Sequence, residues 1–170
     1  MNNAKFVYGK EWNEKLRKMS QPISEDEARS RFVNGPRFSV AKLPYEDAGV
    51  PFYSMEIEPN LSAVNVIFYD EFGSISKLHG FRRIGGQLFQ DSSVSYVYAD
   101  RNRLNRMNDA IILKTVDYDP AGVGRITTDD KSQPTIERVS YDNVDISDNW
   151  EAIPEFGNWD SLGRRDRSSP

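Results

Sequence analysis

Cysteine is absent from this 170-residue chain, and histidine occurs once, at His79. Without cysteine the chain can form no disulfide, no thiolate metal site and no cysteine nucleophile. A single histidine also excludes a multi-histidine metal site and an acid–base pair of two imidazoles. We therefore expect no metal, no cofactor and no enzymatic activity.

Long apolar runs are missing as well. The N-terminus has no basic region followed by an apolar stretch, and nowhere do the ~18 consecutive apolar residues of a membrane-spanning helix occur. The formal net charge of −4 gives no overall attraction to nucleic acid or to an anionic membrane surface. These features predict a soluble, cytoplasmic protein whose partners include neither nucleic acid nor a membrane.

What the sequence does contain is a series of short runs in which apolar and polar residues alternate, as they do in half-buried strands. The runs span 38–43, 52–58, 63–69, 74–78, 87–90, 94–98, 111–116, 125–128 and 135–141. Turn residues separate them, and the connections are too short for parallel crossovers, so the order should be mainly antiparallel. The run at 63–69, which is apolar on both faces, is expected to be the central strand, whereas 52–58 has the pattern of a strand with one face in water.

Two helices are expected before the meander. In 11–19, Trp12, Leu16 and Met19 are spaced as on one face of a helix. In 24–33, Ser24 and Glu27 form a capping box. The predicted fold class is therefore α+β, with two N-terminal helices packed on a strongly twisted, mainly antiparallel sheet or half-open barrel. Residues 1–162 should form one domain, and 163–170, which lacks large apolar side chains, a disordered C-terminal tail.

The most distinctive stretch is 141–162, which carries acids and aromatic residues but no Lys or Arg. Its acids are Asp142, Asp145, Asp148, Glu151, Glu155 and Asp160, and its large aromatic anchors are Trp150, Phe156 and Trp159. One interpretation is a clasp whose aromatic residues pack on the sheet while the acids face water. The other is an acidic strip, held outward by these anchors, that complements a basic groove of a partner protein.

Residues 149–162, following a cysteine-free strand meander, resemble the C-terminal ends of some bacterial immunity proteins, the antitoxins of polymorphic or contact-delivered toxin systems. The resemblance covers about a tenth of the chain. It implies a cytoplasmic, non-enzymatic protein that binds one cognate toxin tightly and occludes its active site. The resemblance assigns no roles to individual residues.

An alternative is a small-molecule-binding or hydrolytic domain with an anionic-ligand pocket around His79. Lys77, His79, Arg82 and Arg83 lie in one short cationic segment and could face such a ligand. A pocket protein should have a deep cavity that converges on His79, whereas an inhibitor should have a shallow acidic face and a packed interior. An extended interface between copies of the chain would indicate a third possibility, a structural subunit.

Overall fold

The computed structural model describes residues 4–44 and 49–167, and its dominant feature is one antiparallel sheet. The chain forms, in order, β1 (Lys5–Gly9), β2 (Glu11–Asn13), β3 (Lys18–Ser20), α1 (Glu25–Asn34), β4 (Phe38–Leu43), β5 (Tyr53–Ile57), η1 (Pro59–Leu61), β6 (Ala63–Tyr69), β7 (Ile75–Ile84), β8 (Gln87–Val97), η2 (Met107–Asp109), β9 (Ile112–Asp119), β10 (Val123–Asp130), β11 (Glu137–Tyr141), η3 (Ser147–Asn149) and β12 (Trp150–Ala152).

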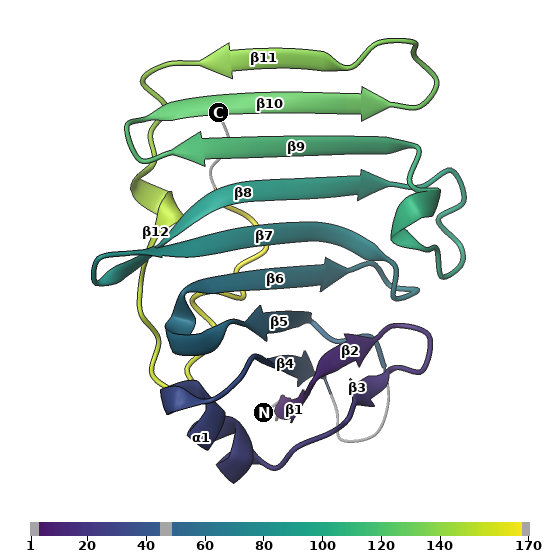
Figure 1. The fold of residues 1–170 in the computed structure, drawn as a ribbon. Coiled ribbons are helices and arrows are strands. Elements are labelled where there is room, and N and C mark those ends of the chain that lie inside the picture. The colour runs from purple at the N-terminus through teal and green to yellow at the C-terminus, as the bar shows by residue number, and fades with distance from the viewer. Residues whose placement is uncertain (1–3, 45–48, 168–170) are drawn as a thin grey trace.

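The strands follow one another through space in the order β1-β4-β5-β6-β7-β8-β9-β10-β11, so β4 to β11 form a meander (Figure 1). β12 pairs with one end of β8, and β2 pairs only with β3. β1 and β11 are the two ends of this order and do not pair with each other, so the sheet is open and is not a barrel. The predicted antiparallel arrangement is confirmed.

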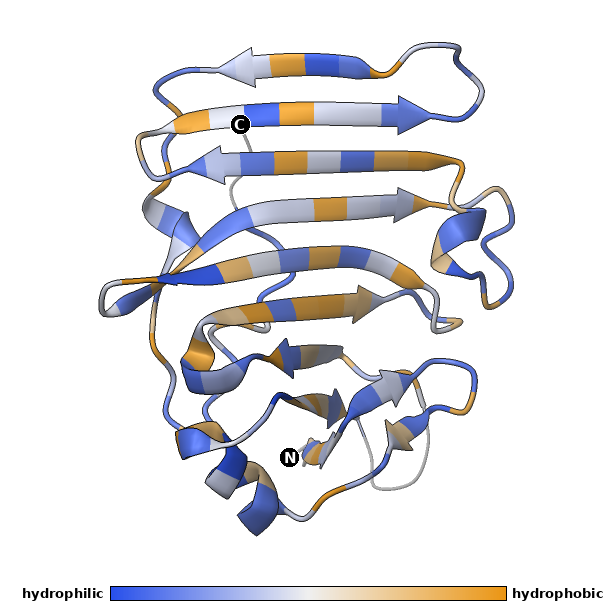
Figure 2. Cartoon of the chain, viewed as in Figure 1, coloured by the Kyte–Doolittle hydropathy of each residue, from blue (hydrophilic) through white to orange (hydrophobic). Residues whose placement is uncertain are grey.

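The period-two pattern of each central strand divides the sheet into a back face and a front face. In β6, Val64, Val66 and Phe68 point to the back, where α1 and the C-terminal segment cover them. This main core also holds Phe38, Val40, Met55, Ile57, Phe81, Leu88, Trp159 and Leu162. Figure 2 shows the alternation of apolar and polar residues along these strands. The back face is therefore the packed interior of the domain.

On the front face, the β2–β3 hairpin covers only the lower strands of Figure 1. Trp12 and Met19 of this hairpin pack with Ala41, Leu43 and Tyr69 in a second cluster. All five residues of β11, at the far end of the sheet, are exposed. A large part of the front face is consequently left without a covering layer.

The prediction of two N-terminal helices is wrong, because α1 is the only helix longer than three residues in the described part of the chain. Residues 11–19 form β2, a turn and β3, with Trp12 directly opposite Met19. A separation of seven residues suits both a helix face and a cross-strand pair. Burial decided between them, because the hairpin buries both side chains while Leu16 stays 59% exposed. Asn13 Oδ1 accepts from Leu16 N–H at 2.8 Å and fixes the turn.

The second predicted helix is confirmed. Ser24 is its N-cap, and the Ser24 hydroxyl accepts from Glu27 N–H at 3.1 Å. The predicted strand at 63–69 is also confirmed as β6, and that at 38–43 as β4. The reversal expected at 91–93 is wrong, because β8 runs through these residues with a bulge opposite Gly80 and Phe81. β8 therefore joins the two runs predicted at 87–90 and 94–98 into one strand, and β7 extends past the predicted end at residue 78 to Ile84.

Residues 164–167, from the segment predicted to be a disordered tail, lie along the back of the sheet and make specific contacts. Arg165 donates to Tyr69 O at 3.1 Å and to Ser76 Oγ at 2.8 Å. The Arg167 side chain is only 2% exposed and pairs with Glu151 at 2.7 Å. Residues 168–170 of the predicted tail lie outside the described residues.

Candidate functional site

The aromatic anchors predicted in the C-terminal segment hold it onto the back of the sheet. Trp159 is 0% exposed, and its ring meets Phe32 of α1 edge-on at a centroid distance of 5.5 Å. Phe156 packs edge-on against Trp159 at 5.6 Å, and Trp150 lies 4.7 Å from Phe89. These contacts fit the role of a clasp.

Two of the six acids in this segment are used inside the protein. Glu151, whose side chain is 11% exposed, pairs with Arg164 and Arg167. Asp160 accepts from Lys42 Nζ at 2.6 Å and from the Tyr53 hydroxyl at 2.8 Å, and its pKa is held below the ordinary value, chiefly by the Lys42 hydrogen bond. Asp160 is nevertheless 63% exposed, and Asp142, Asp145, Asp148 and Glu155 are exposed as well. Only Glu151 of the predicted strip is withdrawn from solvent, while Asp160 faces solvent with its charge paired.

His79 is 1% exposed, because the C-terminal segment covers it on the back of the sheet. Gln90 Nε2 donates to its Nδ1 at 3.0 Å, and its Nε2–H donates to Arg165 O at 3.0 Å, which defines a neutral imidazole. Burial lowers the pKa of His79 to about 4. The hydrogen bonds and the covering segment give this histidine a structural role.

The four residues of the predicted anionic-ligand site do not converge on a cavity. Lys77 Nζ donates to Arg165 O at 3.2 Å, next to His79. Arg82 pairs with Asp91 at 3.1 Å, whereas Arg83 donates to Asn60 O at 3.1 Å. None of these four residues lines any of the cavities described below.

A cavity of about 400 Å³ opens on the front face, between the β2–β3 hairpin and the strands beneath it. We call it the acidic cup. Its lining residues are Glu11, Trp12, Asn13, Glu14, Ser39, Ser54, Glu56, Ile67, Tyr69, Ile75, Leu78 and Met107. Three carboxylates and no Lys or Arg are among them. The cup thus combines an apolar floor with an acidic wall.

The carboxylates of the cup differ in how they are compensated. Glu56 pairs with Arg37 at 2.6 Å and accepts from Asn65 at 3.3 Å. Glu11 and Glu14 form no ion pair with a described cation. The pKa of Glu14 is raised, first by desolvation and then by the nearby charges of Glu11 and Glu56. Negative charge at this site is therefore only partly neutralised within the protein.

Two buried hydroxyl groups complete the wall of the cup. Ser54 Oγ and the Tyr69 hydroxyl, on side chains of residues 2% and 6% exposed, lie 2.6 Å apart and share one hydrogen bond. No other hydrogen bond of either hydroxyl exists among the described residues. Because each oxygen carries two lone pairs and at most one of the four is used, the pair can accept further hydrogen bonds.

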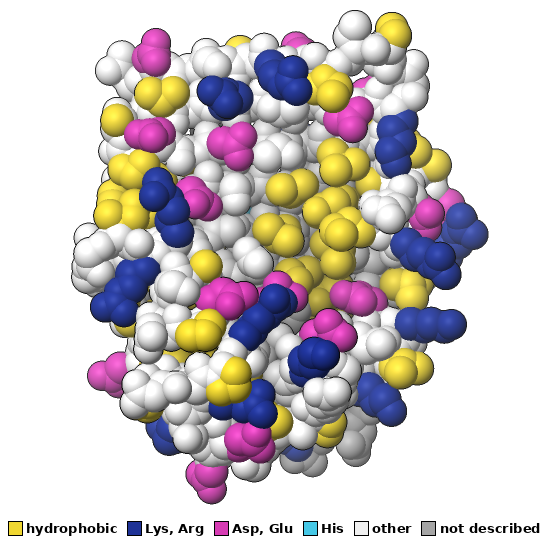
Figure 3. Space-filling model, viewed as in Figure 1, with side chains coloured by type: hydrophobic (Ala, Val, Ile, Leu, Met, Phe, Trp, Pro, Cys, Tyr) yellow, Lys and Arg dark blue, Asp and Glu magenta, His cyan; other side chains and the backbone are white. Residues whose placement is uncertain are grey.

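A second cavity, of about 500 Å³, continues from the cup and shares Glu14, Ile75 and Met107 with it. Leu104 and Met107, from the loop before β9, are 40% and 45% exposed on its far side. Figure 3 shows hydrophobic side chains gathered in the middle of this face, with Asp and Glu side chains, and Lys and Arg side chains among them, along the lower border. The cup and its extension together form a groove on the uncovered side of the sheet.

The apolar floor continues across neighbouring strands. The register places Ile67 opposite Leu78, Leu78 opposite Val94, and Tyr96 opposite Leu113, all half-buried on the same face. An apolar face that continues across neighbouring strands is a common feature of protein interaction sites.

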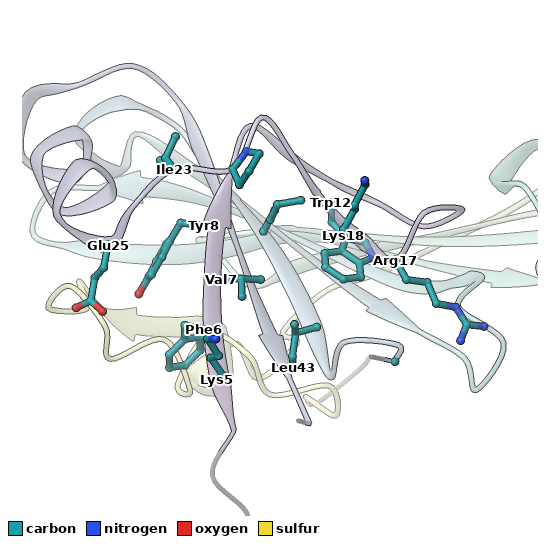
Figure 4. Close-up of a pocket in the computed structure, with 13 residues that line it drawn as sticks. Lys5, Phe6, Val7, Tyr8, Trp12, Arg17, Lys18, Ile23, Glu25 and Leu43 are labelled. Carbon is teal, nitrogen blue, oxygen red and sulfur yellow. The ribbon is translucent and has the colours of Figure 1, made fainter. Parts of the chain in front are cut away.

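A third cavity, of about 560 Å³, runs along the edge strand β1 and is shown in Figure 4. Phe6, Val7, Tyr8, Trp12 and Leu43 contribute apolar walls. Its charged lining residues are Lys5, Arg17, Lys18 and Glu25, so its rim is mainly cationic. The extension of the cup likewise carries Lys15 and Arg106, whereas the cup itself is lined by three carboxylates and no Lys or Arg, and we take the cup as the candidate site.

Sequence reasoning missed the cup because its residues come from separate parts of the chain. Glu11 and Glu14 fall in the segment predicted to be a helix, and Glu56 lies on a strand about 40 residues later. Only the hairpin, which the helical spacing of Trp12 and Met19 concealed, brings them together.

Comparison with protein-family models, curated proteins and solved structures finds no match. No group of three His, Cys, Asp or Glu side chains in the described residues is arranged to hold a metal ion. The longest helix of the described residues, α1, has ten residues and is too short and too polar to cross a bilayer.

Proposed function

We propose that this protein is a non-enzymatic, protein-binding inhibitor of the immunity type, which acts in the cytoplasm and blocks the basic active-site groove of a cognate toxin. The observation that supports this proposal is the groove on the front face, where a half-buried apolar floor lies beside Glu11 and Glu14, which form no ion pair with a described cation. Apolar contacts supply affinity at such a surface, while unpaired charge supplies specificity and a fast on-rate.

The exposed acids of the C-terminal segment add to this proposal. Asp142, Asp145, Asp148 and Glu155 remain exposed. None of these acids lines the groove, and charges away from the central contact change the association rate and its salt dependence more than the final affinity. We assign them the role of steering, while the groove forms the central contact.

The test is a growth assay. Each protein encoded beside this one is expressed in a susceptible bacterium, with and without this chain. A toxic neighbour whose effect disappears when this chain is co-expressed, and which co-purifies with it, supports the proposal. If every neighbour is harmless, or if toxicity persists in the presence of the folded protein, the proposal is refuted.

A further inference from the structure

The acidic cup has the shape and the chemistry to receive one basic side chain. We propose that it binds an arginine or lysine side chain presented by the partner protein, with the alkyl stem on the apolar floor and the cationic head among the carboxylates. This inference rests on the proposed function and names the part of the partner that the cup recognises.

The first argument is charge complementarity. Glu11 and Glu14 line the cup without an ion pair to a described cation, and their proximity, together with Glu56, contributes to the raised pKa of Glu14. A cation placed between them would relieve this like-charge repulsion. Because half-buried charges are screened less by salt than exposed ones, an incoming cation gains more here than at the open surface.

The second argument is the apolar floor. Ile67, Ile75 and Leu78 form the base of the cup, and Trp12 and Met107 stand at its sides. Arg and Lys bury their methylene stems on apolar surface while the head stays among polar groups. A bare inorganic cation would leave this floor uncovered, so the arrangement favours a cation on an alkyl stem.

The third argument is the buried hydroxyl pair. Ser54 and Tyr69 are more than nine-tenths buried, line the cup, and keep unused lone pairs after forming their single shared hydrogen bond. A guanidinium group has five N–H donors and an ammonium group three, and neither has an acceptor. The unused lone pairs of the two hydroxyl groups can accept from such a head, while their one unused O–H proton can turn towards a carboxylate of the cup.

The experiment uses the full-length protein with methyl-labelled Ile, Leu and Met, titrated by NMR with N-acetyl-arginine methylamide and N-acetyl-lysine methylamide. We expect saturable shifts of the Ile67, Ile75 and Leu78 methyl signals and a fall in the pKa of Glu14 at saturation. N-acetyl-norleucine methylamide, which has the stem without the charge, should produce neither effect. The double variant Glu11→Gln/Glu14→Gln should bind at least about tenfold more weakly, since it loses two charged acceptors.

Three results would overturn the inference. They are equal shifts with the norleucine probe, unchanged binding by the double variant, and binding of free agmatine without binding of the capped residues, which would instead indicate a small-molecule site. A matched control variant at two exposed acids outside the cup, Asp117→Asn/Glu137→Gln, should bind the arginine probe like the wild type. The titration needs no toxin. If the capped residues bind while the growth assay fails, the cup inference stands and the proposed function falls. If the growth assay succeeds while the capped residues do not bind, the proposed function stands and the cup inference falls.

Discussion

Replacing Trp159 by alanine should be among the most destabilising single changes in the described part of the chain. Trp159 is 0% exposed and forms edge-on contacts with Phe32 at 5.5 Å and Phe156 at 5.6 Å. Truncation of a buried tryptophan to alanine costs about 3–5 kcal/mol, and each aromatic pair adds roughly 0.5–1.5 kcal/mol beyond the buried area. We expect a loss near the middle of the first range, about 4 kcal/mol, because relaxation of α1 recovers part of the sum.

The assay is urea unfolding followed by tryptophan fluorescence and circular dichroism at neutral pH. Glu155→Gln is the matched control in the same segment, because Glu155 is exposed and surface changes of this kind stay within about 0.5 kcal/mol. If Trp159→Ala costs less than about 1 kcal/mol with an unchanged denaturant slope, the segment does not clasp the sheet. The whole assignment of its aromatic residues to packing would then be wrong.

Three further predictions concern charge and the C-terminal segment. Burial lowers the pKa of His79 from 6.5 to about 4, so the stability that the neutral imidazole contributes is complete above pH 6.5 and is lost as the pH falls towards 4. The loss should reach about 3 kcal/mol, and unfolding curves of His79→Gln should lack this slope. The pKa of Glu14 is raised above 4.5, so the stability linked to its protonation is complete below pH 4.5 and is lost as the pH rises through the folded-state pKa. Glu14→Gln should accordingly be more stable than the wild type at pH 7. Thermal unfolding of both proteins at pH 7 and at pH 4 measures this difference, which should shrink at the lower pH. Arg167→Ala removes a buried partner of Glu151, which keeps Arg164, and we expect a loss of about 1–3 kcal/mol in urea unfolding; no loss would indicate that residues 164–167 do not pack on the sheet.

The sequence predicts the antiparallel meander well where both local signals and burial agree. The strand 63–69 alternates because Val64, Val66 and Phe68 enter the core, and the N-cap at Ser24 depends on neighbours in the chain, although the Glu27 carboxylate pairs with Arg31 and does not complete the predicted capping box. The order of residues within each of these elements is therefore enough to predict it, without information about residues far away in the chain.

Prediction from the sequence fails where contacts between residues far apart in the chain determine the local structure. Trp12 and Met19 fit a helix face, yet their burial against Ala41 and Tyr69 makes a hairpin the better solution. The same hairpin creates the acidic cup, so an error in one local element concealed the candidate site. Charge counting along 141–162 likewise could not reveal that Glu151 and Asp160 would be paired with Arg167 and Lys42.

The central claim is that a basic partner binds at the cup. The most direct measurement is the binding of the toxin found in the growth assay to two neutralised variants, followed by surface plasmon resonance at low and moderate salt, which gives both the affinity and the association rate. The account predicts that Glu11→Gln/Glu14→Gln weakens binding at least about tenfold, while Asp142→Asn/Asp145→Asn changes mainly the association rate and its salt dependence. A normal affinity for the first variant together with a lost affinity for the second would contradict it.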